Sequence, residues 1–188
     1  MANPPAAAQP WLSSGLGVGK STLLDERGAF HKNIKRVDHI AVAVSDLEGT
    51  LQYMTGTLGG TLEEQRVTRG PRTAMESAVV RLGDFTLVIL RGLHPDSQVS
   101  RFVERYGPGV QHIAVEVFNI EDVVRFLNQC GMRFRTRLYD CGKLKQVFTE
   151  RNAETTMMFE FIERVDSDSF DERNIQRLYE DLEDGDLV

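Results

Sequence analysis

The sequence has little of several features that would place its 188 residues in a specialised class. Its two cysteines, Cys130 and Cys141, fit no CxxC or zinc-binding spacing, which indicates reduced thiols in a cytoplasmic protein. No apolar run approaches the roughly 18 residues of a membrane span, and the N-terminus lacks the basic and apolar regions of a secretory signal. Basic residues are in the minority. The net charge of −6 and the pI near 5.3 argue against nucleic-acid binding.

What is present is the composition of an ordinary soluble domain, with 41% hydrophobic and 27% charged residues. One short motif suggests nucleotide binding. The stretch SGLGVGKST, residues 14–22, ends as a phosphate-binding loop does, with a lysine for phosphate and a hydroxyl for Mg²⁺. It has Ser14 where the loop requires glycine, and the preceding AAAQPWLS is too short for the buried strand that such a loop follows. We therefore predict a mobile leader over residues 1–34.

After this leader the chain repeats itself. VDHIAVAVSDLEGTLQYMTGTLGG (37–60) and VQHIAVEVFNIEDVVRFLNQCGMRF (110–134) share the frame V-x-H-I-A-V-x-V. The alternation in each frame predicts a strand, and the amphipathic segment after it predicts a helix. Ser45 with Glu48 forms the expected capping box of the first helix. Asn119 is the expected N-cap of the second helix and Gly131 its stop.

Three strand-like segments follow each helix, at about 61–68, 74–83 and 85–91, and again at about 133–139, 144–149 and 156–163. The sequence thus predicts an α+β fold of two βαβββ modules. Module one spans 35–92, a linker with a short helix spans 93–108, and module two spans 109–164. An acidic helix is expected within 165–188.

Candidate ligands lie on one face of the predicted strands, because residues of the same parity share a face. One such set is Val37, His39, Ala41 and Ala43, and the second is Val110, His112, Ala114 and Glu116. Glu116 lies one pleat repeat from His112, which indicates a rim or salt-bridge residue. The alanine two residues after each histidine leaves space beside the imidazole.

A carboxylate completes the set, since Glu160 stands in the apolar strand MMFEFIE. Leaving it ionised and unpaired there would cost several kcal/mol. Two imidazoles and one carboxylate are the ligands of non-haem Fe(II) oxygenases. His39, His112 and Glu160 therefore predict a metal site, with hydrogen-bonded core histidines as the alternative.

The corner opposite Glu160 distinguishes kinds of metal site. Aligning FTLVILRG (85–92) with MMFEFIER (157–164) puts Val88 in the place of Glu160. An apolar residue there leaves three protein ligands, whereas a lyase or epimerase with closed Lewis-acid coordination would prefer Glu or Gln.

These features resemble the vicinal oxygen chelate superfamily, and within it the catalytic C-terminal half of 4-hydroxyphenylpyruvate dioxygenases and hydroxymandelate synthases. SQVSRFVERYGPGVQHIAVEV is similar to the SQI…GPGVQHIA stretch of those enzymes. KQVFTERNAETTMMFEFIER resembles their LLQIFT…FFEIIQR segment, and ERNIQRLYEDLE their terminal GNFKALFEAIE helix. The resemblance implies a glyoxalase-like open barrel with a C-terminal lid helix. It also implies Fe(II) at the three ligands and a dioxygenase that acts on a 2-oxo acid, or a related chelating small molecule, with O₂.

The resemblance further implies a substrate-binding set at Ser77, Leu90, Gln98, Gln111, Gln146, Phe170 and Asn174. Leu90 replaces the asparagine that the family carries on this strand. Two alternatives stay open. A metal-dependent epimerase or glyoxalase-like lyase is disfavoured by Val88, and a metal-free binding or resistance protein is disfavoured by the three ligands together. No nucleic-acid or membrane partner is expected, and the barrel is completed within one chain or across a homodimer.

Overall fold

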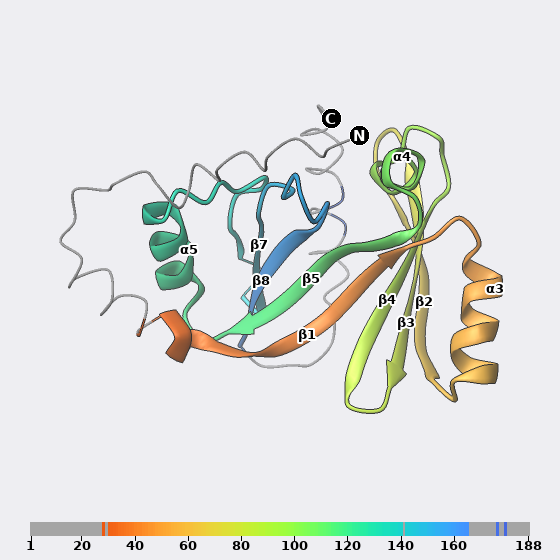
Figure 1. Ribbon diagram of the computed structural model, residues 1–188, viewed down its shortest axis with the longest axis horizontal. Coiled ribbons are helices and arrows are strands. Elements are labelled where there is room, and N and C mark those ends of the chain that lie inside the picture. Colours follow the sequence, from red (N-terminus) through yellow and green to blue (C-terminus); the bar gives the residue numbers. More distant parts are fainter. Residues whose placement is uncertain (1–27, 29, 141, 166–175, 177–178, 180–188) are drawn as a thin grey trace, which may run out of the picture.

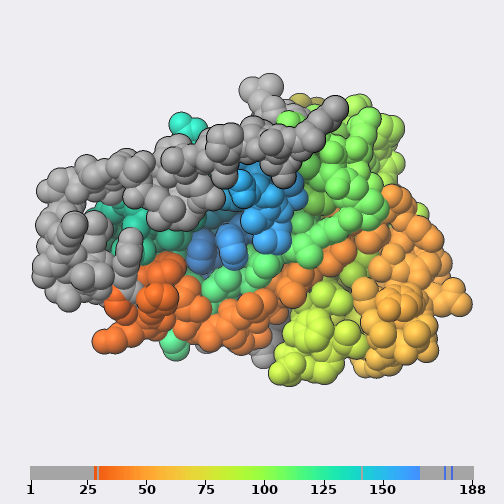
Figure 2. All heavy atoms as spheres, in the orientation of Figure 1, coloured from red at the N-terminus to blue at the C-terminus, as the bar shows by residue number. Residues whose placement is uncertain are grey.

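The computed structural model describes residues 28, 30–140, 142–165, 176 and 179. In these residues a single eight-stranded sheet has the order β2-β3-β4-β1-β5-β8-β7-β6. The strands are β1 (Ile34–Ala43), β2 (Thr61–Arg69), β3 (Ala74–Leu82), β4 (Phe85–Gly92), β5 (Gly109–Val117), β6 (Tyr139–Asp140), β7 (Leu144–Phe148) and β8 (Met158–Arg164). The first strands of the two modules, β1 and β5, pair antiparallel at the centre (Figures 1 and 2). This is the α+β arrangement of two βαβββ modules that the repeat predicts.

Each half of the sheet has a helix on one face (Figure 1). Helix α3 (Leu47–Gln52) runs into a π-helical turn, η1 (Tyr53–Thr57), and packs Leu47 and Leu51 against β3 and β4. Helix α5 (Ile120–Gln129) packs its apolar stripe against Val147 of β7 and Phe161 of β8. The helices thus cover one face of each half and leave the opposite face for a site.

The linker forms helix α4 (Gln98–Tyr106), which packs Val99 and Phe102 against Ala41, Ala43 and Leu90. Ser97 caps this helix by accepting from the amide of Ser100 at 3.1 Å. Gly92 at the end of β4 permits the close approach, because a Cβ there would lie 2.1 Å from the Oγ atoms of both serines. A small residue is therefore required where β4 meets the helix.

The first helix begins one residue later than the capping box predicts. Asp46, not Ser45, is the N-cap of α3, and its Oδ1 accepts from the amide of Gly49 at 3.0 Å. The expected pairing of Ser45 with Glu48 is therefore wrong. Asp and Ser are comparable caps, and Gly49 leaves room for the aspartate, since a Cβ at Gly49 would lie 2.3 Å from its Oδ2. Asn119 caps α5 as expected, and Gly131 follows that helix with φ +82°.

The strand expected over 133–139 is the largest error of element assignment. Regular pairing with β7 is confined to Tyr139 and Asp140, with one isolated bridge between Phe134 and Thr149. The reason is a side chain that takes a ladder bond: Oγ1 of Thr136 accepts from the amide of Phe148 at 2.9 Å. This side-chain bond competes with the main-chain ladder.

The face assigned to β1 is wrong at its first residue, because Val37 is 49% exposed while Asp38 and His39 are both buried. The β1–β5 register shifts between Val37 and His39, so two residues of β1 there oppose one step of β5. Such a bulge re-aims side chains. It brings Asp38 to the same side as His39.

Some expected features lie outside the described residues. They are the SGLGVGKST stretch, Phe170, Asn174 and most of the acidic terminal segment. At the end of the expected leader, Phe30 stacks on Phe126 of α5 with 4.9 Å between ring centroids. None of the helices in the described part of the chain is long and apolar enough to cross a membrane.

Candidate metal centre

The three expected ligands converge from the central strands. His39 of β1, His112 of β5 and Glu160 of β8 each offer a ligand atom, and these atoms lie within 4.8 Å of one another. Oε2 of Glu160 is 3.4 Å from Nε2 of His39 and 3.6 Å from Nε2 of His112. All three side chains are buried.

His39 is oriented by a chain of charged groups. Its Nδ1 lies 2.9 Å from Oδ1 of Asp38, and because a carboxylate only accepts, Nδ1–H is the donor. Asp38 in turn accepts two bonds from the guanidinium of Arg164, at 2.9 and 3.0 Å. This arrangement is the carboxylate–histidine support found behind metal ligands, and it directs Nε2 toward the centre.

His112 is oriented by a neutral partner instead. Its Nδ1 lies 2.8 Å from Oε1 of Gln111, the residue before it in β5. The edge of its ring meets the ring of Phe148, with 5.1 Å between centroids. Both histidines thus have Nδ1 engaged and Nε2 directed at Glu160.

The two imidazoles differ in charge preference. Burial lowers the pKa of His39, but its bonds to Asp38 and Glu160 outweigh burial and raise the pKa to about 9. Burial lowers the pKa of His112 well below its ordinary value, and the charges of His39 and Arg151 lower it further. Burial would raise the pKa of Asp38, yet His39 and Arg164 hold it well below the usual range.

The residues present fit a divalent metal ion. Glu160 is 4% exposed, and the printed polar contacts of its carboxylate are with the two imidazoles. Without a metal, a proton on Nε2 of His39 is what balances this buried carboxylate. Two imidazole nitrogens and a carboxylate oxygen are donors that suit first-row divalent metals, so a cation in this position would satisfy all three groups.

A pocket of about 90 Å³ opens beside these ligands. Every expected substrate residue that the structure describes lines it: Ser77, Leu90, Gln98, Gln111 and Gln146. Nε2 of Gln146 is buried and has no hydrogen-bond partner among the described residues. Its free N–H groups are therefore available to a ligand oxygen.

Val88 occupies the corner that sequence alignment gives it. It pairs with Ala41 across β4 and β1 as Glu160 pairs with Ala114 across β8 and β5. Val88 also lines the pocket. The described residues therefore offer three ligand side chains and an apolar fourth corner.

The sequence reading missed three pocket features. Asp38 supports His39, and the signal was present, because a polar residue precedes histidine in both V-x-H-I frames. Arg66 of β2 lines the pocket and pairs with Glu64, although no pattern in this strand marks it. Tyr179 is 1% exposed and lines the pocket, and its hydroxyl lies 2.7 Å from Oγ1 of Thr73. Glu116, expected as a rim residue, pairs with Lys35 and Arg36.

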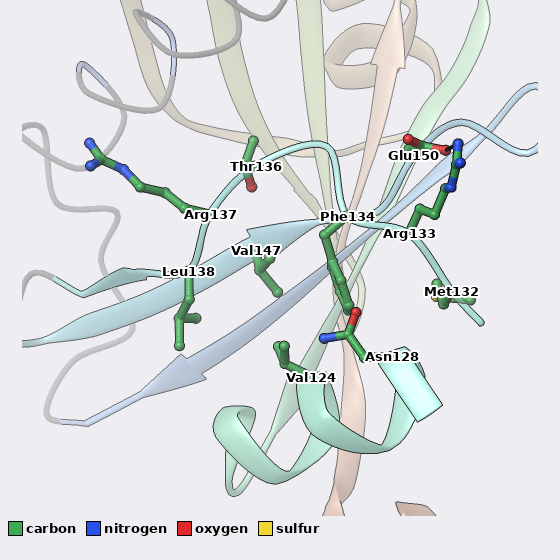
Figure 3. A pocket seen from close by; sticks show the side chains of 10 residues that line it. All are labelled: Val124, Asn128, Met132, Arg133, Phe134, Thr136, Arg137, Leu138, Val147 and Glu150. Carbon is green, nitrogen blue, oxygen red and sulfur yellow. Dashed lines mark ion pairs between the residues drawn. The ribbon is translucent and has the colours of Figure 1, made fainter. Parts of the chain in front are cut away.

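A larger hollow of about 470 Å³ lies elsewhere, between α5 and the segment that leads into β6 (Figure 3). Phe134 points toward Val124 and Asn128 of α5, and Arg133 pairs with Glu150 at the rim, at 3.6 Å. None of the metal-centre residues lines it. The chemistry therefore belongs to the smaller pocket.

Comparison with known proteins defines the class. Residues 38–149, more than half of the chain, match the family described as the Glyoxalase/Bleomycin resistance protein/Dioxygenase superfamily. The chain belongs to this superfamily, whose members include the vicinal oxygen chelate fold seen here.

Particular relatives fall on both sides of the mechanistic question. The mitochondrial methylmalonyl-CoA epimerase of Homo sapiens is 30% identical over 102 residues, which are 54% of this chain and 57% of that protein. The Mus musculus epimerase is 31% identical over 99 residues, covering 52% and 54%. The chain spans about half the length of these curated relatives.

Solved structures show the same division. A mutant of 4-hydroxymandelate synthase from Streptomyces coelicolor superposes with a TM-score of 0.71 at 24% identity, covering 80% of this chain and 54% of that chain. Methylmalonyl-CoA epimerase from Mycobacterium tuberculosis gives a TM-score of 0.61 at 20% identity, covering 73% and 96%. At these identities the likeness shows the fold.

Proposed function

We propose that this protein is a non-haem Fe(II)-dependent dioxygenase that acts on a 2-oxo acid or a related chelating small molecule, with O₂ as co-substrate. The observation that carries the proposal is the three-ligand set with Val88 in the fourth corner. Three ligands on one side leave coordination positions for substrate and O₂. His39, His112 and Glu160 would hold the metal.

When bound, Fe(II) supplies the electrons for O₂ activation and a Lewis acid for two substrate oxygens. In the reaction that the resemblance implies, one oxygen atom enters the new carboxylate, the other forms the hydroxyl group, and CO₂ is released.

The chain itself supplies orientation and a dry pocket. Asp38 and Gln111 hold the two imidazoles so that both Nε2 atoms face the metal position. The buried amide of Gln146 can donate to a substrate oxygen. Apolar side chains, among them Val88, Leu90 and Phe148, exclude water from the reacting end.

A metal-dependent epimerase is the second candidate, and the 30% identity to methylmalonyl-CoA epimerase favours it. In that reaction the metal would act only as a Lewis acid while a base moves a proton. Glu160 is the carboxylate nearest the centre, and using it as a ligand leaves no second carboxylate among the described pocket residues to serve as that base. A metal-free binding protein is the third candidate, and the buried Glu160 between two imidazoles counts against it.

The deciding experiment is metal analysis of anaerobically purified protein, followed by O₂ consumption against a panel of 2-oxo acids. We expect one iron per chain and O₂ uptake that depends on both iron and one member of the panel. Epimerisation of a 2-substituted acyl thioester without O₂ consumption, supported equally by Co²⁺, would instead establish the second candidate.

A further inference from the structure

A second cavity, of about 270 Å³, adjoins the metal pocket. Gln98 of α4 and Met158 of β8 line both cavities. Met158 also pairs in register with His112. A single elongated molecule can therefore reach from the metal centre into the second cavity.

This cavity is strongly basic. Four arginines line it: Arg101 and Arg105 from α4, Arg135 from the segment before β7, and Arg151 from the segment after it. Among the described residues that line it there is no carboxylate. Burial lowers the pKa of Arg135, and the charge of Arg101 lowers it further. The guanidinium groups remain charged at neutral pH, so four positive charges share one small volume.

The arginine nearest the metal centre is held in place before any ligand arrives. The guanidinium of Arg151 lies over Phe102, 4.7 Å from the ring centroid, and 5.5 Å from the centroid of Tyr106. One of its nitrogens also donates to the carbonyl of Thr156. Its charge contributes to the lowered pKa of His112, so this guanidinium and the metal centre interact electrostatically.

We propose that the arginine cavity binds a phosphate group of the substrate, whose chelating end lies at the metal centre. Guanidinium groups match phosphate oxygens through paired N–H donors, and four of them supply more charge than one carboxylate would balance. The substrate class is thus an elongated molecule with two acidic ends. The statement about the chelating end rests on the proposed function, whereas phosphate binding does not.

The test is calorimetric titration of inorganic phosphate, pyrophosphate and succinate into the metal-free full chain at low ionic strength. We expect one saturable site per chain, with pyrophosphate and phosphate bound more tightly than succinate. Raising the salt from about 50 to about 200 mM should weaken binding at least several-fold, because the attraction is screened.

Variants locate the site. Arg101→Gln and Arg105→Gln should each weaken pyrophosphate binding about tenfold. The matched control is Arg125→Gln, on the exposed side of α5, where Arg125 pairs with Asp122; it should leave binding unchanged. Unchanged thermal unfolding would show that each variant is folded.

Three results would overturn the proposal. They are no saturable anion binding, equal loss in the Arg125 control, and binding that appears only after deletion of the acidic residues 180–188, which would make that segment the occupant. Because the titration uses neither metal nor O₂, failure of the dioxygenase assignment would leave its outcome unchanged.

Discussion

The buried acid beside a metal ligand is the residue on which most of the centre depends. Asp38 accepts from His39 on one side and from Arg164 on the other, and the side chain of Arg164 is itself only 6% exposed. One carboxylate therefore fixes an imidazole and balances a buried guanidinium. Loss of its charge affects metal affinity and stability together.

Asp38→Asn should lower metal affinity about 10- to 100-fold, as loss of such support does elsewhere. It should also lower the free energy of unfolding of the metal-free protein by about 3 kcal/mol, because Arg164 is left buried with a neutral partner. Competition with a chelator and urea unfolding measure the two effects. Asp46→Asn, at the exposed cap of α3, is the control and should change neither, since Asn caps as well as Asp.

Val88 offers a direct test of ligand number. Val88→Glu places a carboxylate opposite Glu160, so metal affinity should rise while O₂ consumption falls at least tenfold because a coordination position is filled. Val88→Leu keeps the corner apolar and should retain both. Full O₂ consumption in the glutamate variant would mean that position 88 does not face the metal.

Leu90 bears on the substrate. The wall that it forms is buried and apolar, and a site that cannot pair a polar substrate group loses roughly 10⁴-fold in discrimination. The iron-loaded protein should therefore be inefficient with 4-hydroxyphenylpyruvate. Product analysis for homogentisate and hydroxymandelate provides the measurement, and rapid saturable turnover to either would show that Leu90 does not restrict this substrate.

At the scale of elements, the contact between β4 and α4 is the tightest junction described. Gly92→Ala should lower the free energy of unfolding by about 1–3 kcal/mol, because the added Cβ meets Ser97 and Ser100. It should also weaken substrate binding, since α4 carries Gln98. Gly109→Ala, in a strand with open space at its Cβ, should be nearly neutral in the same unfolding measurement.

Sequence patterns predict the elements well where apolar periodicity alone defines them. The strands of module one lie within a residue or two of the expected ranges, because β2, β3 and β4 form regular ladders. The 133–139 strand could not be predicted correctly, because its pairing is interrupted by a hydroxyl of Thr136. The Asp38 contact depends on a bulge, which alternation cannot reveal. The three ligands could be predicted because the repeat places them at equivalent strand positions.

At the scale of the whole molecule, the beginning of the folded unit is testable. Deleting residues 1–27 should leave stability and metal content unchanged. Extending the deletion through residue 33 should lower the free energy of unfolding by about 1–3 kcal/mol, because it removes the stacking of Phe30 on Phe126. The longer deletion also removes the carbonyl of Asn33 that accepts from the amide of Phe118 at 2.9 Å. Chemical unfolding and metal analysis of both truncated chains measure this, and equal stability would place the start of the unit after residue 33.

The equivalence of Val88 and Glu160 within the repeat has a consequence for how the two halves divide their labour. Module one contributes one ligand and module two contributes two. A chain made of two copies of module two would present two imidazoles and two carboxylates, whereas two copies of module one would present imidazoles alone. A duplicated ancestor of either kind could thus reach the present centre by exchange of one side chain in one copy. Position 88 is where a symmetric scaffold became an asymmetric one.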